Sequence, residues 1–400
     1  MNKKTVRDID VEGRRVLLRV DFNVPIDGET GRITDDRRIR EALPTIEYLL
    51  GQRSRVIIAS ALGRPMGRVV PGLSLRPVAE KLSQLLGQPV VMAADSVGPE
   101  VEETAAALEP GSTLMLENLR FHAAEEANEE AHARQLAALA DVFALDAFGS
   151  AHREHASTSG ISRCLPAVAG FLVEKEMTYL GKAVSDPDHP YAVISGGAKI
   201  SDKLPMLRTM LDVADRILIG GGMANTFLKA EGFDVQQSLV EGEMVAQASE
   251  IMEIAAAARK QLLLPVDVVV ADRFDRNASY QTVSVKDVPP GALIVDVGEK
   301  TVEVFTRVLR DCRQVVWNGP LGVIEFPQAA HGSHQVAYAL SRMNEATTIL
   351  GGGETAMIAE QLNIGDRFTH VSTGGGASLE ILSGATLPAI EALLDRTVTV

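Results

Sequence analysis

The chain has 400 residues, 46% of them hydrophobic and 23% charged, which is the balance of a globular protein with more than one domain. Its formal net charge of −14 argues against general nucleic-acid binding, because such proteins present a basic face. No apolar run reaches about 18 residues, so we expect no membrane span, and the start MNKKTVRDIDVEG lacks the apolar core of a secretory signal.

The two cysteines, Cys164 and Cys312, are far apart in the chain. Such a pair forms neither a disulfide framework nor a zinc site. We therefore expect both thiols to be reduced and buried in a core, and we expect the protein to be cytoplasmic.

Short β-branched runs recur along the chain and predict strands. Examples are residues 16–20, 56–58, 113–116, 191–194, 216–219, 268–270, 314–317 and 347–350. Most are separated by segments with helical spacing; in 77–86, apolar residues recur at i, i+4, i+7 and i+8, Pro77 suits the first turn and Gly87 suits the C-terminal cap. The alternation predicts an α/β fold with doubly wound, mostly parallel sheets, whose ligands bind at the carboxyl ends of the strands.

The residues that follow the predicted strands differ between the two halves of the chain. In roughly residues 1–170 they include Arg, Asn, Asp and His, as in LRVDFNVP, IIASALGRP, LENLRFH and LDAFGSAHREHAS. In the second half they are glycines, as in VISGGAKISDK, ILIGGGMANTF, ILGGGETAM and HVSTGGGAS. Between the halves, FLVEKEMTYLGKAVSDPDHP begins with a helical pattern and breaks at 186–190, where we expect a hinge.

The first half carries several arginines in or after its strands, and a guanidinium can bind carboxylate or phosphate with two hydrogen bonds. They are Arg19, Arg38, Arg64, Arg120 and Arg153. A single arginine of this kind is more often a solvated surface residue, but the set predicts a site for a small acidic ligand. Asp21 and Asn23 suit a hydroxyl group, although each alone is more often a turn or cap residue.

Glycine triplets after apolar strands allow backbone amides to approach a phosphate or a purine, with a helix N-terminus directed at the anion. Three such triplets are harder to dismiss as tight turns than one. Lys199 and Lys203, at i and i+4, are expected on one face of a first helical turn, either to neutralise phosphoryl oxygens or as a plain surface. Glu325 and Glu354 suit ribose hydroxyls and Mg²⁺, or cap a helix.

Two common nucleotide signatures are absent from the sequence. There is no GxxxxGK[ST] motif, and no GxGxxG opens a βαβ unit with an acidic residue about 20 positions later. Residues 374–379 begin like the second motif but lack its last glycine. These absences argue against a P-loop ATPase and against a typical dehydrogenase.

The sequence resembles the phosphoglycerate kinases over nearly its whole length, in strings that follow the family's order and spacing: LRVDFNVPIDG, AGFLVEKE, GGGMANTF, WNGPLGVIEFP and STGGGASLEILSG. The resemblance implies two doubly wound α/β domains joined by a hinge helix, with the C-terminal tail packed on the N-terminal domain. It places an acid-binding domain at 1–171 plus about 388–400, the hinge helix and linker at 172–190, and a nucleotide-binding domain at 191–387.

The resemblance also implies the reaction, a reversible Mg²⁺-dependent phosphoryl transfer between ATP and the carboxylate of 3-phosphoglycerate that gives ADP and 1,3-bisphosphoglycerate. The residues that would bind the acid are Asp21, Phe22, Asn23, Arg38, Ala61, Leu62, Gly63, Arg64, Arg120 and Arg153. The residues that would bind MgATP are Lys203, Gly221, Gly222, Gly298, Asn318, Glu325, Gly351, Gly352, Gly353, Glu354 and Thr355.

Within these sets the resemblance implies separate roles. Arg38, Lys199 and Lys203 would be catalytic and stabilise the transferring group, and Glu354 would be the metal ligand. No general base is needed, because the acceptor carboxylate is ionised near pH 7 and the reaction depends on positioning and charge neutralisation. The family is usually monomeric and acts on small molecules, so we expect a monomer.

The resemblance also implies which residues contact the adenine, the ribose and the phosphates of the nucleotide. Gly221 and Gly222 would flank the adenine, with Gly298 nearby. Asn318 would contact the nucleotide and Glu325 the ribose. Lys203 and the 351–353 loop would hold the phosphates.

Four residues depart from the family's usual pattern. Ala61 stands where a histidine helps bind the acid, and Glu354 stands where an aspartate holds Mg²⁺. Leu145 replaces an asparagine, and Glu299 replaces a proline. The first two would weaken acid binding and disturb the octahedral geometry of the metal. The alternative hypothesis is therefore a catalytically weakened member of the fold that binds nucleotide or phosphoglycerate; a dinucleotide-dependent dehydrogenase is a third.

Overall fold

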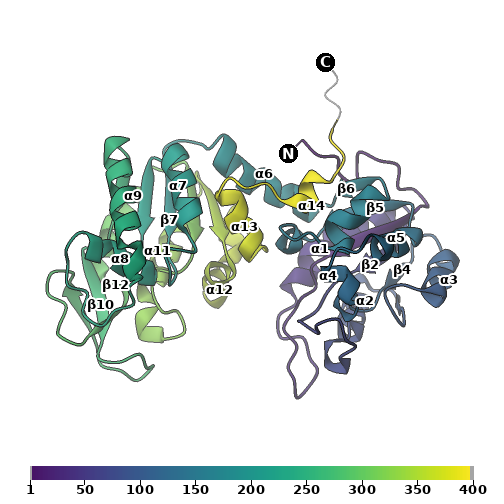
Figure 1. Cartoon of the computed structure of the whole chain (residues 1–400), viewed down its shortest axis with the longest axis horizontal. Coiled ribbons are helices and arrows are strands. Elements are labelled where there is room, and N and C mark those ends of the chain that lie inside the picture. The colour runs from purple at the N-terminus through teal and green to yellow at the C-terminus, as the bar shows by residue number, and fades with distance from the viewer. Residues whose placement is uncertain (1, 397–400) are drawn as a thin grey trace. The chain divides into compact units, whose positions relative to one another are not determined.

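The computed structural model describes residues 2–396, so the predicted tail at 397–400 lies outside the described residues. The chain divides into two compact units (Figure 1). The first unit ends at Thr178 and also includes the segment from Thr386 onward; the second is Tyr179–Ala385. Within residues 2–396, no helix combines the length and the apolar character needed to cross a membrane.

The first unit is built on a six-stranded parallel sheet with the order β3-β4-β2-β1-β5-β6. Its strands are β1 (Arg15–Val20), β2 (Arg55–Ala59), β3 (Val90–Met92), β4 (Thr113–Met115), β5 (Val142–Asp146) and β6 (Ala167–Ala169). Its helices are α1 (Arg37–Gly51), α2 (Arg76–Leu86), α3 (Pro99–Ala107), α4 (Ala123–Glu126), α5 (Glu130–Ala138), the first half of α6 (Phe171–Ser185), and α14 (Pro388–Glu391).

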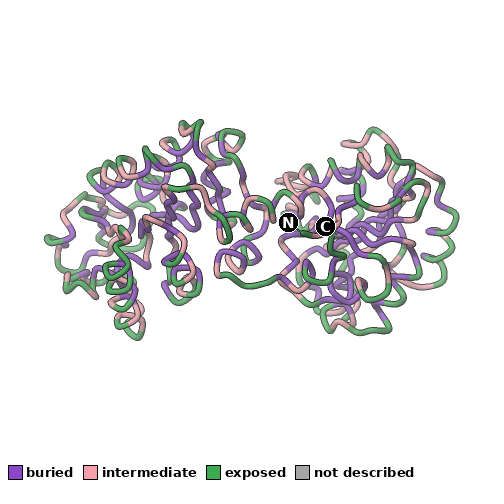
Figure 2. Tube along the Cα trace, turned by 90° about the horizontal axis from the view of Figure 1, so that it is seen from above, coloured by how far each residue is buried: buried purple, intermediate pink, exposed green. Residues whose placement is uncertain are grey.

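The helix predicted at 77–86 is confirmed as α2. Pro77 lies in its first turn, and Gly87 ends it in the left-handed conformation with φ 67°. Val78 and Leu82 are fully buried and pack with the strands of the parallel sheet, together with Ile39 of α1. Figure 2 shows that buried residues are concentrated in the interior of this unit and exposed residues around it. Burial of each large aliphatic side chain contributes roughly 1.5–3 kcal/mol, so the apolar face of α2 fixes its orientation on the sheet.

The segment after Thr386 lies against the N-terminal segment of the same unit. The Leu394 amide donates to the carbonyl of Ala167 in β6 at 2.9 Å, and the Lys4 amide donates to the Leu394 carbonyl at 2.7 Å. Val6 in turn donates to Ala169 at 3.0 Å. The two ends of the chain are therefore joined through backbone hydrogen bonds at the β6 edge of the sheet.

The second unit contains another six-stranded parallel sheet, with the order β15-β14-β13-β7-β8-β9. Its strands are β7 (Tyr191–Ser195), β8 (Arg216–Ile219), β9 (Gln261–Leu263), β13 (Gln314–Asn318), β14 (Thr347–Gly351) and β15 (His370–Val371). Its helices are α7 (Leu204–Val213), α8 (Gly221–Ala230), α9 (Val245–Ala257), α10 (Glu299–Leu309), α11 (His331–Leu340), α12 (Gly353–Gln361) and α13 (Gly375–Leu382).

Helices cover both faces of this second sheet. Ile194 and Trp317 of the strands share one core with Phe305 of α10 and Leu340 of α11. Residues that alternate with them along each strand point to the other face. There, α7, α8, α9 and α13 contact one another. The unit is therefore doubly wound, as the alternation of strands and helices predicts.

One predicted strand lies in a small antiparallel sheet, and not in a parallel sheet as expected. Residues 268–270 lie in β10 (Asp267–Ala271), which forms a small antiparallel sheet with β11 (Tyr280–Ser284) and β12 (Leu293–Val297). Only residues 272–279 link β10 to β11. A parallel pair needs a crossover of about a dozen residues or more, so this short link forces an antiparallel hairpin.

The other predicted strands are confirmed to within one or two residues at each end, and 216–219 has the bounds of β8. The expectation of two buried cysteines is wrong for one of them. Cys312 is buried, but Cys164 is exposed. Cys164 follows the short 3₁₀ turn Ile161–Arg163 on the loop that leads into β6, so no second layer covers it.

The N-terminus of α6 is held by a buried carboxyl group. Asp146, at the end of β5, accepts hydrogen bonds from the amides of Leu172 at 2.9 Å and Val173 at 3.3 Å. Burial raises the pKa of Asp146 from 3.8 to about 7, although these hydrogen bonds act to lower it. A Cβ on Gly170 would lie 2.3 Å from this carboxyl group, so position 170 has room only for glycine.

This carboxyl group makes stability depend on pH. Because its pKa is raised on folding, its contribution is full below the unfolded value and is lost as the pH rises through about 7. Asp146→Asn keeps an oxygen for the helix amides and carries no charge. We expect it to match the wild type in thermal unfolding near pH 4, to exceed it increasingly up to about pH 7, and to keep a constant margin from there to pH 8. Parallel curves for the two proteins would contradict this, and exposed Asp287→Asn is the control.

Candidate active site

In the first unit, the predicted acid-binding residues gather at the carboxyl ends of neighbouring strands. Asp21 follows β1, and its carboxylate accepts a hydrogen bond from Nη1 of Arg38 at 2.6 Å. Arg38 lies in the first turn of α1. The side chains of Arg38 and Asp21 are 33% and 17% exposed, so both reach solvent while they orient each other.

The loop after β2 is held from two sides by residues from other strands. The amide of Gly63 donates to Oδ1 of Asn23 at 2.9 Å, and its carbonyl accepts from Nη1 of Arg120 at 2.8 Å. The backbone amide of Phe22, a fully buried residue, donates to Oγ of Ser60 at 2.9 Å. These contacts fix the relative positions of the ends of β1, β2 and β4.

Sequence reasoning missed Asn118, which organises this same region. Its Oδ1 accepts from the amides of Leu62 and Arg120, both at 3.1 Å. Its Nδ2 donates to the carbonyls of Leu62 at 2.7 Å and Leu73 at 2.9 Å. The side chain is fully buried. An asparagine after a strand is typical of a turn, so the residue type gave no signal for this role.

Arg19 serves the interior of the unit. It is 1% exposed, and its Nε donates to Oγ of Ser157 at 2.9 Å. Ser157 also donates to the buried carboxylate of Glu125, from its amide at 3.0 Å and its hydroxyl at 2.5 Å. Burial lowers the pKa of Arg19 and raises that of Glu125, and the charge of each opposes the shift of the other. Arg19 therefore holds the loop beyond Arg153.

The remaining arginines concentrate positive charge in this unit. Arg64 is exposed and Arg153 is half-buried. The pKa of His155 falls to about 4, mainly through burial and then through the charges of Arg19, Arg120 and Arg153. A chain with a net charge of −14 thus contains a local cationic cluster that suits an anionic ligand.

In the second unit, three glycine-containing loops meet at backbone contact distance. The Gly197 amide donates to the carbonyl of Pro320 at 2.8 Å, and the Met223 amide donates to that of Gly197 at 3.0 Å. Gly221 has φ 66°, and a Cβ there would lie 2.6 Å from the Gly197 nitrogen. Sequence reasoning did not predict the loop at 196–197 as a site, although its glycine pair after β7 was the available signal.

Lys203 lies among these loops. Its Nζ donates to Oδ1 of Asn318, a residue that is 1% exposed. Burial lowers the pKa of Lys203, while the charges of Glu354 and Asp202 oppose that shift. Nδ2 of Asn318 has no partner among the described residues. Lys203, Asn318 and Glu354, which are predicted to contact the nucleotide, therefore lie close together. Nδ2 of Asn318 is the donor that is left for a ligand.

The expected helical turn that carries both lysines is wrong. Helix α7 begins at Leu204 with Pro205 in its first turn, and residues 196–203 form loops and turns. Gly197 has φ 101°, a conformation outside the helical region. Lys203 is half-buried and Lys199 is exposed, so the two side chains do not share one helix face.

The 351–353 loop forms the N-terminus of α12, and Gly352 has φ 91°. Thr355 is buried, and its hydroxyl accepts a hydrogen bond from the Gly319 amide at 2.7 Å. This bond ties the loop after β14 to the loop after β13. Glu354 is exposed in the first turn of the helix.

These residues fit Mg²⁺ bound together with a nucleotide. Among residues 2–396, no group of three or more His, Cys, Asp or Glu side chains is arranged to hold a metal ion. Mg²⁺ keeps several waters and is usually held by one or two carboxylates plus substrate phosphates. The single exposed carboxylate of Glu354 beside a glycine loop matches that kind of site.

The other predicted nucleotide residues are placed as follows. Gly298 caps α10 and contacts Asp267, whose carboxylate a Cβ would approach to 2.3 Å. Packing against Asp267 alone is enough to require glycine there. Glu325 is exposed, and its carbonyl accepts from Arg276 at 3.3 Å. A Cβ on Gly222 would lie 2.9 Å from the carbonyl oxygen of Ala198, so this glycine also allows a close approach of two loops.

Two of the residues that depart from the family's usual pattern are buried. Leu145 is fully buried in β5, and Ala61 is 5% exposed. An imidazole at position 61 would therefore need space that the present packing fills. Glu299 is the first residue of α10, where its negative charge suits the positive helix end.

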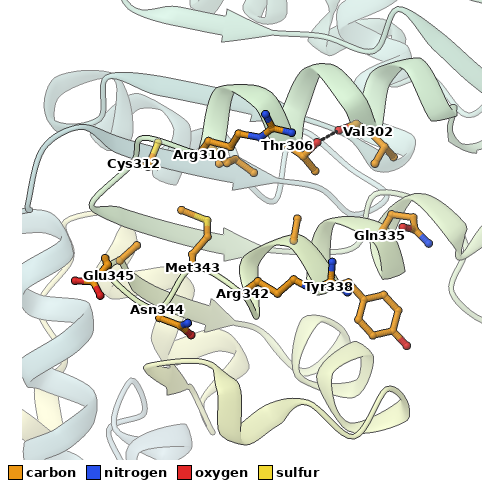
Figure 3. Close-up of a pocket in the computed structure, with 13 residues that line it drawn as sticks. Val302, Thr306, Arg310, Cys312, Gln335, Tyr338, Arg342, Met343, Asn344 and Glu345 are labelled. Atoms are coloured by element: carbon orange, nitrogen blue, oxygen red, sulfur yellow. Dashed lines mark hydrogen bonds between the residues drawn. The ribbon is translucent and has the colours of Figure 1, made fainter.

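A separate cavity of about 900 Å³ lies between α10 and α11 (Figure 3). It is lined by Arg310, Arg342 and Glu345 and by apolar side chains such as Met343. Cys312 and Ala346, which also line it, precede β13 and β14. The cavity therefore lies at the amino ends of these strands, at the opposite edge of the sheet from the glycine loops.

Comparison with known proteins gives one family. A family model described as phosphoglycerate kinase matches residues 6–385. A phosphoglycerate kinase of Moorella thermoacetica is 51% identical over 396 residues, which cover 99% of this chain and 100% of the relative. One from Chloroflexus aurantiacus is 51% identical over 399 residues, with 99% and 100% covered.

Solved structures agree with the sequence relatives. The structure of phosphoglycerate kinase from Coxiella burnetii matches with a TM-score of 0.87 at 37% identity, covering 98% of each chain. That of phosphoglycerate kinase from Pyrococcus horikoshii matches with a TM-score of 0.84 at 32% identity, again with 98% of each covered. The chain belongs to the phosphoglycerate kinase family of enzymes.

Proposed function

We propose that this enzyme transfers a phosphoryl group reversibly between ATP and the carboxylate of 3-phosphoglycerate, forming ADP and 1,3-bisphosphoglycerate. The observation that carries the proposal is the division of labour between the two units. One gathers arginines at the carboxyl edge of its sheet, and the other gathers glycine loops around a half-buried lysine. The pair suits a small acid and a nucleotide.

In the first unit, the acid is bound through side chains. Arg38 and Arg120 are already oriented by Asp21 and Gly63, so little side-chain entropy is lost when an anion binds. Asp21 and Asn23 orient the hydroxyl of the acid. Arg64 and Arg153 complete the contacts to its charges, with Ala61, Leu62 and Phe22 as the apolar support.

In the second unit, the nucleotide is bound mainly through backbone. Gly221 and Gly222 flank the adenine, and Gly298 lies beyond Val297 near the same region. The phosphates contact Lys203, Asn318 and the loop of Gly351, Gly352 and Gly353, which leads into Thr355. Glu325 contacts the ribose. The loop at the N-terminus of α12 supports this assignment, because helix N-termini favour anions.

Transfer joins a carboxylate oxygen of the acid to the γ-phosphorus and breaks the bond from that phosphorus to the bridging oxygen of ADP. No proton moves, since the carboxylate is already ionised. Arg38, Lys199 and Lys203 stabilise the charge on the transferring group. Glu354 would hold Mg²⁺, which when bound would supply neutralisation of the phosphate charge.

Because the acid and the nucleotide bind to separate units, the two ligands must be brought together for the reaction. We place the hinge at 172–190, where α6 crosses from one unit to the other and ends at Ser185. The acid-binding domain corresponds to 1–171 plus 388–400 and the nucleotide-binding domain to 191–387. We expect a cytoplasmic monomer that uses MgATP or MgADP and small-molecule substrates only.

The decisive experiment is a coupled assay of 1,3-bisphosphoglycerate formation with 3-phosphoglycerate, ATP and Mg²⁺. Turnover that requires Mg²⁺ supports the proposal and makes Ala61 and Glu354 tolerated variations. Nucleotide binding by calorimetry without turnover would instead favour the weakened, binding-only alternative. No nucleotide binding at all would refute both.

Arg38→Ala is expected to lower kcat by about a hundredfold or more, the usual cost of removing one donor to transition-state charge. Circular dichroism and Tm should change little, because Arg38 is partly exposed and its side chain is paired, among residues 2–396, with Asp21. Arg40→Ala is the matched control on the same helix, since Arg40 pairs with Asp36. Equal kcat for both variants would remove Arg38 from the mechanism.

Glu354→Gln is expected to raise the Mg²⁺ concentration for half-maximal rate by about tenfold, because a charged ligand is replaced by a neutral amide. Glu354→Asp should keep a low Mg²⁺ requirement. Titration of Mg²⁺ at fixed ATP measures this, with exposed Glu345→Gln as the control. An unchanged Mg²⁺ dependence in Glu354→Gln would place the metal ligand elsewhere.

A further inference from the structure

The cavity between α10 and α11 has the size of a small-molecule site. Its volume of about 900 Å³ falls within the range of about 300–1,000 Å³ that ligand pockets occupy. It lies at the amino ends of β13 and β14, whereas the ligands of parallel sheets bind at the carboxyl ends. The cavity is therefore separate from the proposed nucleotide site, and the proposed function leaves it unused.

Two helix faces form the walls of this cavity. Phe305 of α10 and Val336 of α11 are fully buried in the core of the second unit, so both helices are held in place without a ligand. The wall residues recur at spacings of three or four, which places them on one face of each helix. They are Val302, Thr306 and Leu309 on α10 and Gln335, Tyr338 and Ala339 on α11.

Two guanidinium groups at this cavity have no hydrogen-bond or ion-pair partner among the described residues. Arg310 directly follows α10, and Arg342 follows Ser341 at the end of α11. Figure 3 shows the side chain of Arg310 lying along α10 toward Thr306 and that of Arg342 lying along α11 toward Tyr338. The two facing helices thus each bring one unpaired positive charge to the same cavity.

The acidic groups near these arginines are paired or directed elsewhere. Asp311, the neighbour of Arg310 in the chain, accepts a hydrogen bond from Nη2 of Arg216 at 2.9 Å. Glu345 is the acidic residue among those that line the cavity, and its carboxylate is directed away from both guanidinium groups (Figure 3). Two arginines and one glutamate give the lining a positive charge in a chain whose net charge is −14. The cavity therefore suits an anion.

We propose that this cavity is a second binding site, for a phosphate monoester that carries an apolar organic group. A guanidinium binds phosphate oxygens with paired, charge-assisted hydrogen bonds, and two of them match a dianionic phosphate. The organic group packs on the half-buried side chains of Val302 and Met343 and on Leu309, which is 1% exposed. The inference goes beyond the proposed function, and its test requires no turnover.

The test is an NMR titration of the full-length protein, labelled with ¹³C at its methionine methyl groups, with phenyl phosphate. Met343→Leu identifies the signal of Met343, which lines the cavity. We expect phenyl phosphate to shift this signal with a Kd of about 1 mM, and phenol and inorganic phosphate to bind at least about tenfold more weakly, because each offers half of the recognised chemistry. No shift up to about 10 mM phenyl phosphate, or equal affinity for inorganic phosphate, would overturn the proposal.

Variants of the two arginines separate ligand binding from helix stability. Arg310→Ala and Arg342→Ala should each weaken phenyl phosphate binding about tenfold, the equivalent of one lost charge-assisted hydrogen bond. Arg307→Ala is the matched control, since Arg307 lies in the last turn of α10 but does not line the cavity. All three variants remove a favourable positive charge at a helix C-terminus and should lower Tm by similar small amounts. Unchanged affinity in Arg310→Ala and Arg342→Ala would assign both arginines to the helix ends alone and overturn the proposal.

Discussion

Both units depend on one constraint of parallel sheets: every strand ends at the same edge. In the first unit that edge collects Asp21 after β1, Gly63 after β2 and Asn118 after β4. In the second it collects Gly196 after β7 and Gly319 after β13. Loops that are far apart in the sequence thereby become neighbours, and the active-site chemistry is set by what each loop carries.

The same edge suits different ligands in the two units, because one unit presents side chains there and the other presents backbone. The edge of the first unit presents guanidinium groups, of which that of Arg38 is held by Asp21 and that of Arg120 by the Gly63 carbonyl. The buried Arg19 and Glu125 hold the loop beyond Arg153 through Ser157, at the cost of desolvating two charges. At the nucleotide edge, removal of side chains brings backbone amides close together.

The sequence was sufficient for most strands, the fold class and the family, because these follow from local patterns and from strings specific to the family, whereas the domain bounds and the site residues stay predictions. It was insufficient where tertiary contacts decide. The antiparallel direction of β11 against β10 depends on the length of the link between them, and the role of Asn118 depends on whether distant backbone satisfies its amide. The predicted helical turn at Lys199 and Lys203 is wrong because Gly197 and Pro205 delay the start of the helix. The predicted burial of Cys164 is wrong because the burial of a loop residue is not a local property of the sequence.

Two of the departures from the family pattern, Ala61 and Glu354, would bear on function through ligand contacts and leave the supporting framework intact. Asn23, Arg120 and Asn118 hold the 61–64 loop through its backbone, so the side chain of Ala61 plays no part in its position. Lys203 contacts Asn318 without help from Glu354. A lost contact at either position would weaken a ligand's affinity without displacing the groups that neutralise the transferring phosphoryl. This favours an active enzyme with adjusted affinities over a fold that only binds.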